Sequence, residues 1–455
     1  MAIVTINPAT GRKLRSYRLH SDRQVETIAD KAGRAFQGWR QTTLAHRARL
    51  LRALARELHR AQPALASLAT AEMGKPVTQA LAEVEKCALG CEYYAANGPG
   101  FLADERPAGA PTHRFVTYRP YGVVLAIMPW NFPFWQIFRV AAPALLAGNT
   151  VLLKHAANVT GCALAIAQTF RRAGFPAGAF QALVTDSRGA SRLVSDPRIS
   201  AVTFTGSTAV GRKIASRAGA AMKKGVFELG GSDPYVVLAD ADLAQAAEVC
   251  AAARLYNTGQ SCVAGKRFIV VEKVRARFEE LFIARLLARR TGDPREATTD
   301  LGPLARADLR AALHAQVRKS VRCGAKLLLG GRLPTGPGFY YPPTVLTGVR
   351  PGMPAYHDEL FGPVAAIISA QDEADAIRIA NDSPYGLGAA VFTKNKKRGE
   401  RIARAQLDSG CAFVNEFVRS HPALPFGGTK QSGYGRELGA WGIREFAHAK
   451  TVSVS

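Results

Sequence analysis

The apolar run GVVLAIM at residues 122–128 is the stretch that most restricts the fold of this chain. A strand covered by helices on both faces of a parallel sheet carries such an unbroken apolar run, whereas a half-exposed strand alternates apolar and polar residues. The run ends in the turn-forming sequence PWNFP at 129–133, and residues 136–147 have helical apolar spacing. We therefore predict a buried strand of a parallel sheet, followed by a helix.

The alternation of strand and helix continues on both sides of this run. Such a βαβ series predicts a doubly wound parallel sheet whose ligands bind at the carboxyl ends of the strands. A second α/β region is expected from residue 235 onward. The other predicted strands are 115–119, 150–154, 180–184, 201–204, 268–271, 326–329, 364–368, 411–414 and 451–454, and the other predicted helices are 26–39, 46–61, 77–97, 162–173, 208–218, 243–255, 275–288, 308–322 and 373–381.

Length and composition are those of a multidomain globular protein. The chain has 455 residues, 47% hydrophobic and 21% charged, so two or three domains are expected. The sequence shows no signal-peptide pattern and no apolar run long enough to cross a bilayer, so we expect no membrane partner and a cytoplasmic location. The seven cysteines and nine histidines lack disulfide or metal-ligand spacing, so no metal is expected.

The formal net charge of +25 raises the question of a nucleic-acid partner. The basic residues are spread over the whole length, and no zinc finger, helix-turn-helix or aromatic-interleaved basic motif accompanies them. A diffuse positive field also suits the steering of an anionic cofactor or substrate. We favour steering or a plain bias of composition, and keep a basic nucleic-acid-binding protein as the alternative from another class of function.

Cys262 stands in a polar stretch, YNTGQSCVAGKR at residues 256–267. Gly259 and Gly265 allow tight turns and leave the thiol uncrowded, as a nucleophile requires. Most isolated cysteines pack as small apolar side chains, but such a position is rarely surrounded by Asn, Thr, Gln, Ser and Lys. We therefore predict a catalytic thiol at Cys262.

Polar groups also follow the ends of predicted strands. Trp130 and Asn131 follow the central strand, Lys154 ends the next strand, and the sequence FTGSTAVG at 204–211 opens a helix. A strand-to-helix turn of this kind presents backbone N–H groups and a positive helix end to a phosphate, although a plain turn has the same pattern. We expect an anionic ligand near these strand ends.

Glu228 lies in an apolar strand-like run and is followed by Gly230 and Gly231. A carboxyl group is rarely buried unless it is paired or functional, and burial raises its pKa toward that of a general base. A glutamate on an edge strand that faces water is the alternative.

Seven of these motifs follow one another in a fixed order: PWNFP at 129–133, Lys154, FTGS at 204–207, ELGG at 228–231, GQSC at 259–262, ELFGP at 359–363 and PFGG at 425–428. In this order the chain resembles the aldehyde dehydrogenase family from end to end. Several runs are closer still to the bacterial NAD(P)-dependent succinate-semialdehyde dehydrogenases of the Sad type.

The resemblance implies a doubly wound parallel-sheet cofactor domain, an α/β catalytic domain and a small β oligomerisation element. The cofactor domain would take residues 1–111 and 122–233, and the catalytic domain residues 234–430. The oligomerisation element would take residues 112–121 and 431–455, with a strand near 115–121 beside the C-terminal strand. A homodimer or homotetramer is expected.

The resemblance also implies roles in catalysis. Cys262 would be the nucleophile, and Glu228 the base that activates the hydrolytic water. The side-chain amide of Asn131 and the backbone N–H of Cys262 would form the oxyanion hole.

NAD or NADP is the implied cofactor. Lys154 and Glu359 would bind its ribose hydroxyls, Gly206 and Ser207 would meet the pyrophosphate, and Phe361 would lie beside the nicotinamide. The full set of residues expected at the cofactor is Trp130, Asn131, Lys154, His155, Ala156, Ala157, Gly206, Ser207, Leu229, Glu359 and Phe361.

A few positions bear on specificity. Many NAD-preferring relatives carry Glu three residues after the lysine that corresponds to Lys154, but Ala157 stands there, so NADP is not excluded.

Arg139 matches an arginine that binds the distal carboxylate in related succinate-semialdehyde dehydrogenases, although a structural role on its helix is the alternative. A second family arginine falls at Tyr256, where Arg254 or Arg419 could substitute. We predict oxidation of succinate semialdehyde to succinate, with another aliphatic or aromatic aldehyde as the alternative substrate.

Overall fold

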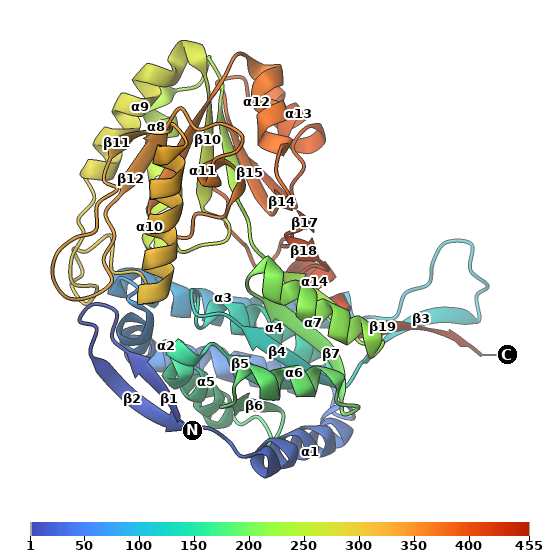
Figure 1. The fold of residues 1–455 in the computed structure, drawn as a ribbon. Helices are drawn as coiled ribbons and strands as arrows, with labels where there is room; N and C mark the ends of the chain where they lie inside the picture. Colours follow the sequence, from blue (N-terminus) through green and yellow to red (C-terminus); the bar gives the residue numbers. More distant parts are fainter. Residues whose placement is uncertain (1, 455) are drawn as a thin grey trace.

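The computed structural model describes residues 2–454, and the chain is arranged around two large sheets, one in each half of the molecule (Figure 1). The first sheet contains the predicted central strand, β4, with β7 and β5 as its parallel neighbours. Its order is β18 (Gly433–Tyr434), β8 (Lys224–Glu228), β7 (Ile199–Thr205), β4 (Val123–Met128), β5 (Thr150–His155) and β6 (Phe180–Leu183). Only β18 runs antiparallel to its neighbour among these described strands.

Helices cover both faces of the first sheet, as the unbroken apolar run predicted. Alternate residues of β4 enter two separate cores: Val124, Ala126 and Met128 pack on one side, and Val123, Leu125 and Ile127 on the other. The first core is formed with α2 (Leu44–Met73), α3 (Val77–Phe101), α4 (Trp135–Ala147) and α5 (Thr160–Arg172), and the second with α1 (Asp22–Trp39), α6 (Ser187–Ser195) and α7 (Thr208–Ala220). The doubly wound arrangement is confirmed.

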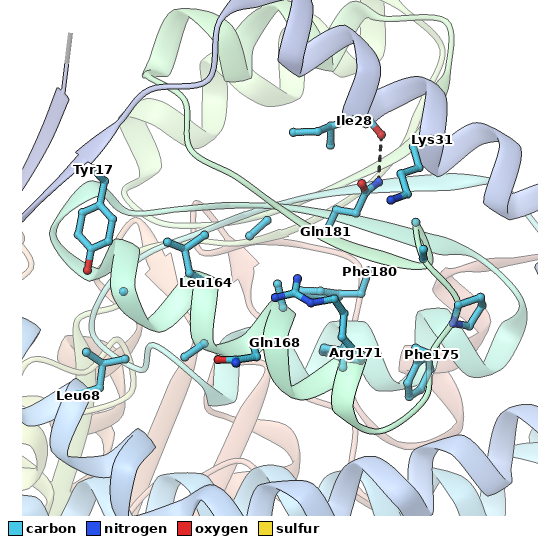
Figure 2. A pocket seen from close by; sticks show the side chains of 18 of the residues that line it. Tyr17, Ile28, Lys31, Leu68, Leu164, Gln168, Arg171, Phe175, Phe180 and Gln181 are labelled. Atoms are coloured by element: carbon cyan, nitrogen blue, oxygen red, sulfur yellow. Dashed lines mark hydrogen bonds between the residues drawn. The ribbon is translucent and has the colours of Figure 1, made fainter.

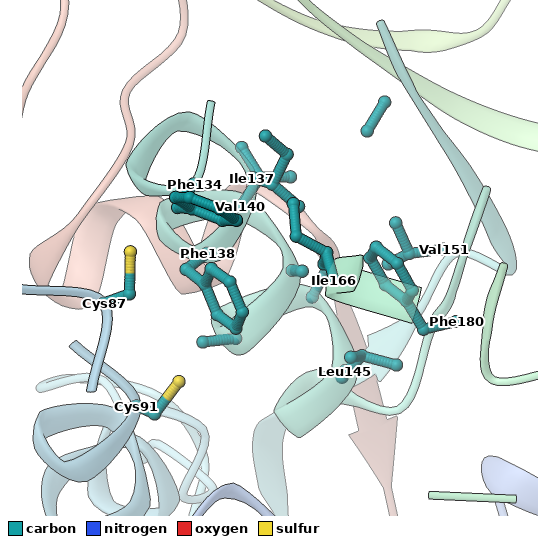
Figure 3. Close-up of a cluster of buried hydrophobic side chains, with 14 of the residues drawn as sticks. Cys87, Cys91, Phe134, Ile137, Phe138, Val140, Leu145, Val151, Ile166 and Phe180 are labelled. Carbon is teal, nitrogen blue, oxygen red and sulfur yellow. The ribbon is translucent and has the colours of Figure 1, made fainter. Parts of the chain in front are cut away.

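Aromatic packing fixes α4 and α5 against the first sheet. Figure 3 shows Phe138 of α4 and Ile166 of α5 close to Val151 and Phe180 of the neighbouring strands. The ring of Phe170 stacks on that of Phe180 with centroids 4.1 Å apart. Such buried rings remove large apolar areas from water, so they hold the helix that follows the PWNFP turn in one position.

The second sheet has seven strands and lies in the other half of the chain (Figure 1). Helices again pack on both of its faces, α8 (Leu243–Leu255) and α9 (Glu272–Leu287) on one, and α10 (Ala307–Arg322), α11 (Pro354–His357), α12 (Glu373–Asn381) and α13 (Lys396–Ala405) on the other. Its strand order is β11 (Lys326–Leu329), β12 (Thr344–Thr347), β13 (Val364–Ala370), β10 (Gly265–Val271), β9 (Asp233–Val237), β15 (Gly388–Phe392) and β16 (Cys411–Val414).

A two-stranded ribbon projects from the first half of the molecule (Figure 1). It pairs β3 (Arg114–Pro120) with β19 (Ala447–Ser453) in antiparallel register, which is the strand pair that the resemblance implied. The residues just before β19 do not belong to the ribbon. Strand β18 pairs with β8, and α14 (Gly439–Glu445) packs against α3 and α4. The C-terminal segment therefore contributes to the first half of the molecule as well as to the ribbon.

The structure differs from the sequence-based expectation in two places near the N-terminus. A hairpin of β1 (Ala2–Ile6) and β2 (Lys13–Arg18) was not predicted. Helix α2 was expected to end at residue 61, before Pro63, but it continues to Met73. A proline inside a helix costs about 3 kcal/mol. Here the turns beyond it bury Leu65 and Met73, and this burial outweighs the lost hydrogen bond.

One short strand pair and two 3₁₀ helices complete the described strands and helices. Strands β14 (Tyr385–Gly386) and β17 (Thr429–Lys430) form an antiparallel pair. Single-turn 3₁₀ helices η1 (Ala157–Val159) and η2 (Tyr256–Gly259) follow β5 and α8. No helix within residues 2–454 is long and apolar enough to cross a membrane.

A buried ion pair supports the start of α4, the helix that carries Arg139. Glu83 of α3 accepts the backbone N–H groups of Phe134 and Trp135 at 2.8 and 2.9 Å through Oε1. Its Oε2 pairs with Lys75, and both side chains are 1% exposed. Because Glu83 satisfies two free N–H groups at a helix start and a buried ammonium together, it fixes α4 against α3.

Replacing Glu83 with Leu should therefore be strongly destabilising. The variant would leave the Lys75 ammonium buried without a partner, which costs about 3–5 kcal/mol of unfolding free energy. Urea unfolding followed by tryptophan fluorescence measures the change. Glu57→Ala, which breaks the surface pair with Arg60, is the control and should cost less than about 1 kcal/mol. Equal midpoints for the two variants would contradict the role of Glu83.

Candidate active site

Cys262 follows a backbone segment that is held in a sparsely populated conformation. Asn257 and Thr258 of η2 both have φ of 55°, in the left-handed region. Asparagine tolerates this region, but a β-branched threonine is rarely found there, so the surrounding contacts must stabilise it.

One side chain and two backbone groups from distant elements supply those contacts. Gln79 of α3 accepts the Asn257 N–H at 2.8 Å, and Asn257 Nδ2 donates to the carbonyl of Asn131 at 2.8 Å. The Thr258 hydroxyl accepts the N–H of Gly302 at 3.1 Å. The loop before Cys262 is thus tied to both halves of the molecule.

The residues beside Cys262 have little freedom either. The buried ammonium of Lys266 donates to the carbonyls of Ser261 and Cys262 at 2.9 and 2.8 Å. Gly259 has φ of 73°, and a Cβ there would lie 2.4 Å from the carbonyl of Gly362. A glycine is required at this position, because any side chain would collide with backbone.

Arg254 supports this loop from beneath. Its side chain is completely buried, and Nη2 donates to the carbonyl of Gly259 at 2.6 Å. Arg254 does not line the cavities at Cys262, although the neighbouring Ala253 does. The structure therefore places Arg254 among the residues that hold the loop and does not bring it to the predicted substrate position, because α8 turns its side chain into the core.

Two cavities meet at Cys262. The first, which we call the Arg139 cavity, has a volume of about 250 Å³. The second, the Glu359 cavity, has about 220 Å³. Cys262 and Gln136 line both of them. The half-buried thiol is therefore reached from two sides.

The Glu359 cavity brings together most of the residues predicted at the cofactor. They come from the carboxyl ends of the strands of the first sheet and from the loop before β13. Its predicted members are Trp130, Asn131, Gly206, Ser207, Leu229, Glu359 and Phe361. The rings of Trp130 and Phe361 meet edge to face, with centroids 5.7 Å apart.

Asn131 is oriented by hydrogen bonds to both ends of its amide. Nδ2 donates to the carbonyl of Gln260 at 3.0 Å, and Oδ1 accepts from Gln136 Nε2 at 3.0 Å. One of the two amide N–H groups remains for another acceptor beside the thiol. The backbone N–H of Cys262 likewise has no acceptor within residues 2–454. This is the donor pair that an oxyanion hole needs.

Glu228 is buried at the end of β8 with 2% of its surface exposed, so the alternative of a water-facing edge residue is wrong. Neither carboxylate oxygen has a hydrogen-bond partner within the described chain. Burial raises the pKa of Glu228 well above its usual value, and the negative charge of Glu437 adds to this. A raised pKa is the property expected of a base that must both take up and release a proton.

Glu228 does not line either cavity at Cys262. Its Oε1 lies against Gly427, where an added Cβ would be 2.8 Å away. The absence of a side chain at Gly427 leaves room beside the carboxylate. Action on a group bound to Cys262 therefore requires Glu228 to rotate toward the thiol.

Arg139 lines the Arg139 cavity, but its charge already has a partner. Its Nε forms an ion pair with Glu437, and Nη2 donates to the Thr205 hydroxyl at 3.3 Å. Arg139 and Glu437 are 4% and 0% exposed. Arg139 therefore lines the cavity, as the predicted substrate role requires, and it also forms an internal ion pair, as the alternative structural role requires.

The thiol of Cys262 is protonated in this environment. Burial raises its pKa to about 12, although the positive charges of Arg139 and Lys266 oppose the shift. Only a minute fraction would be thiolate near neutral pH, so attack requires a proton acceptor or a further positive charge.

The start of α7 and the end of β5 fit an anionic cofactor. Ser207 caps α7 without a side-chain hydrogen bond, so the first N–H groups of this 13-residue helix are free to bind a phosphate. Lys154 is the last residue but one of β5, and burial lowers its pKa while Asp186 opposes the change. Glu359 accepts the N–H of Gly231 at 3.1 Å and lies 3.7 Å from Lys266 Nζ. These groups match the donors and acceptors of a dinucleotide.

His155 is turned away from the ligand side of the sheet. Its ring contacts the carbonyls of Met128 and Pro133 at 3.2 and 3.0 Å, and burial lowers its pKa to about 4. Its side chain therefore stays neutral and cannot offer a charge to a phosphate. Ala156 and Ala157 follow at the start of η1, with no side-chain group that would repel one.

Two residues at this site were not identified from the sequence. Glu437, the partner of Arg139, was not singled out, since pairing between such distant residues leaves no local pattern. Lys86 lines the Arg139 cavity from α3. Its sequence neighbours, among them Glu83 and Glu85, gave no signal, because charged residues are ordinary on a helix that is partly exposed.

The largest cavity, of about 670 Å³, lies elsewhere. It is bounded by α1, α5 and β6, and its wall includes Tyr17, Lys31 and Arg171 (Figure 2). None of the predicted site residues lines it. The chemistry that Cys262 and Asn131 support therefore belongs to the two smaller cavities.

A doubly wound sheet whose strand ends suit an anionic dinucleotide, next to a half-buried thiol and the oriented amide of Asn131, is typical of an oxidoreductase that uses a cysteine. The profile of the aldehyde dehydrogenase family matches residues 1–452. The chain belongs to this family, and the predicted family and fold class are confirmed.

Individual relatives agree over the whole chain. It is 49% identical over 455 residues to a probable NADP(+) succinate-semialdehyde dehydrogenase from Synechocystis, with full coverage of both chains. It is 47% identical to the NAD(P)+ succinate semialdehyde dehydrogenase Sad of Escherichia coli, covering 99% of this chain and 97% of that one. A crystal structure of succinic semialdehyde dehydrogenase from Streptococcus pyogenes in complex with NADP+ superposes with a TM-score of 0.97 at 36% identity, covering 100% of each chain.

Replacing Cys262 with Ala should abolish aldehyde oxidation, because no other residue can form the covalent adduct. Cofactor binding should persist, since the thiol is only one of the groups that line the Glu359 cavity. Reduced-cofactor absorbance measures turnover, and fluorescence titration measures binding. Cys323→Ala, at an exposed cysteine, is the matched control and should keep wild-type activity. Turnover of Cys262→Ala within about tenfold of wild type would contradict the assignment.

Glu228→Gln should separate the two halves of the reaction. Gln resembles the protonated, neutral form of Glu228, so the fold should be retained. Stopped-flow absorbance should show a burst of about one reduced cofactor per active site, followed by a stall at the acyl-enzyme stage. Glu416→Gln, on the surface, is the control. Full steady-state turnover would show that Glu228 is not the base, and loss of the burst would assign it to the first step.

Proposed function

We propose that this protein oxidises succinate semialdehyde to succinate with NAD or NADP. The observation that carries the proposal is the position of Cys262 between two cavities. The Glu359 cavity gathers the strand-end residues suited to a dinucleotide, and the Arg139 cavity is bordered by the cations Lys86, Arg139 and Arg419. The names of the relatives in Synechocystis and Escherichia coli support the same substrate.

The first half of the reaction would be formation of a covalent adduct. The Cys262 sulfur attacks the aldehyde carbon, and its proton leaves to a base. The carbonyl oxygen becomes an oxyanion that accepts hydrogen bonds from Asn131 Nδ2 and the Cys262 backbone N–H. One such donor is worth about 3 kcal/mol in comparable sites.

The second half would release the acid. The hydride of the thiohemiacetal would pass to the nicotinamide ring, which is the oxidant that the bound cofactor would supply. Cys262 would then carry a thioester, which water must hydrolyse. Glu228, ionised and rotated toward the sulfur, would take a proton from that water as the new C–O bond forms, and would return a proton to the sulfur as the C–S bond breaks. The acyl group is thus transferred to water, and no thiol other than Cys262 is needed.

The residues proposed to hold the cofactor follow from the geometry of the strand ends. The N-terminal turn of α7 with Gly206 and Ser207 would bind the pyrophosphate, and Lys154 and Glu359 the ribose hydroxyls. Because Ala157 adds no negative charge beside Lys154, a 2′-phosphate would not be repelled there. We therefore propose that both NAD and NADP are accepted.

The ribbon of β3 and β19 is proposed to mediate assembly into a cytoplasmic homodimer or homotetramer. It projects from the molecule with most of the β19 residues exposed (Figure 1). An antiparallel ribbon with solvent-facing strand edges is suited to pairing with another chain. The division of the chain into cofactor, catalytic and oligomerisation domains is proposed on the same basis.

An aldehyde panel run with each cofactor tests the proposed substrate. Succinate semialdehyde should exceed butanal, its nearest uncharged analogue, in kcat/KM by about 10- to 100-fold, the effect of one charge-assisted contact worth about 1.5–3 kcal/mol. Benzaldehyde tests the alternative of an aromatic substrate. Equal or higher kcat/KM for the uncharged aldehydes would contradict the proposal and leave the family assignment intact.

A further inference from the structure

Lys86 is an enclosed cation whose partners are all neutral. It lies on α3 and lines the Arg139 cavity together with Cys262. Its Nζ donates to the backbone carbonyl and the hydroxyl of Ser420 at 2.7 and 2.9 Å, and lies 4.6 Å from the centre of the Trp135 ring. It forms no ion pair with any of residues 2–454 within 4.0 Å. Lys86 is half-buried, and an ammonium that is partly shielded from water without a negative partner would be stabilised by an anion that enters the cavity.

The other charged groups around the cavity are already engaged or open to solvent. Glu83, one turn before Lys86 on α3, pairs with Lys75 and caps α4. Arg139 pairs with Glu437. The Arg419 side chain is 64% exposed and lies 3.9 Å from Glu416. Lys86 is therefore the cation whose charge is enclosed and still uncompensated.

Ser420 provides a second donor beside the ammonium. Its hydroxyl oxygen accepts from Lys86 Nζ at 2.9 Å and from Trp135 Nε1 at 3.0 Å. Both lone pairs of the oxygen are then used, and its O–H has no acceptor within the described chain. Lys86 has three N–H donors and uses two of them on Ser420. One N–H and one O–H thus remain side by side at the cavity wall.

We propose that Lys86 and Ser420 bind the distal carboxylate of the aldehyde substrate and determine the preference for a carboxylated aldehyde. One carboxylate oxygen would accept from the Lys86 ammonium and the other from the Ser420 hydroxyl. The inference rests on the proposed oxidation of succinate semialdehyde and assigns binding of its carboxylate to Lys86. Arg139 lines the same cavity, but its charge is paired with Glu437.

A pH dependence follows, because Lys86 must be protonated to attract the carboxylate. Burial lowers the pKa of Lys86 to about 8, and the positive charge of Arg139 adds to this. Glu83 and Cys87 on the same helix oppose the shift, while Arg419 across the cavity adds to it. Preference for the charged substrate should therefore be complete below about pH 7 and be lost as the pH rises through about 8.

The experiment measures kcat/KM for succinate semialdehyde and for butanal between pH 6.5 and 9.5, at saturating NAD. The ratio of the two values cancels the titrations of Cys262 and Glu228, which act on both substrates. Wild type should lose most of its ratio above about pH 8. Lys86→Arg should keep the ratio across the range, because a guanidinium does not deprotonate there.

Lys86→Met keeps the length of the side chain without the charge, and its ratio should be about 10- to 100-fold below wild type at pH 7, chiefly through KM for succinate semialdehyde. Lys319→Met, at an exposed lysine on α10, is the matched control and should leave the ratio unchanged. A wild-type ratio that stays constant with pH, or a Lys86→Met ratio equal to wild type, overturns the inference. The wild-type pH profile decides the matter even if a variant does not fold.

The two levels of the proposal fail in different ways. If wild type shows no preference for succinate semialdehyde at pH 7, both the proposed substrate and the role of Lys86 are wrong. If wild type shows the preference and Lys86→Met retains it, the substrate stands and the carboxylate binds elsewhere, with Arg139 as the next residue to replace.

Discussion

The strained loop before Cys262 is the constraint on which the rest of the site depends. Asn257 and Thr258 hold left-handed conformations that are fixed by the Gln79 side chain of α3 and by backbone groups of Asn131 and Gly302. The same contacts set the thiol between the two cavities. A site that must present one sulfur to two ligands needs this rigidity, since an error of about 1 Å in position can cost a factor of 100 in rate.

Buried charge is the second theme of the structure. One guanidinium, Arg139, stands between two buried carboxyl groups, pairing directly with Glu437 while its charge also lowers the pKa of Glu228. Burial and the charge of Glu437 outweigh that effect, so the pKa of Glu228 stays well above its usual value. The pairing with Glu437 also explains why Arg139 is not free to act as a simple substrate anchor.

Sequence patterns predicted the fold well where a local pattern of apolar residues indicates which side chains are buried. The run at 122–128 became β4, with alternate residues in two cores. The helix predicted at 46–61 was too short. The prediction ended it before Pro63 because proline usually breaks a helix, whereas the buried apolar residues that continue to Met73 keep the chain helical. The hairpin of β1 and β2 was missed, because its mostly exposed residues give no clear alternation.

For the site, the sequence by itself determined the candidates for chemistry: the thiol of Cys262 from its polar flanks, the carboxyl of Glu228 from its apolar strand, and the amide of Asn131 from the family resemblance. Only the tertiary structure decided how they are partnered. Arg254 and His155 turn into the interior, Arg139 meets Glu437, and Lys86 reaches Ser420. Each of these outcomes depends on a contact between elements far apart in the chain, and the energy of a buried charge is set by that contact and not by its neighbours in sequence.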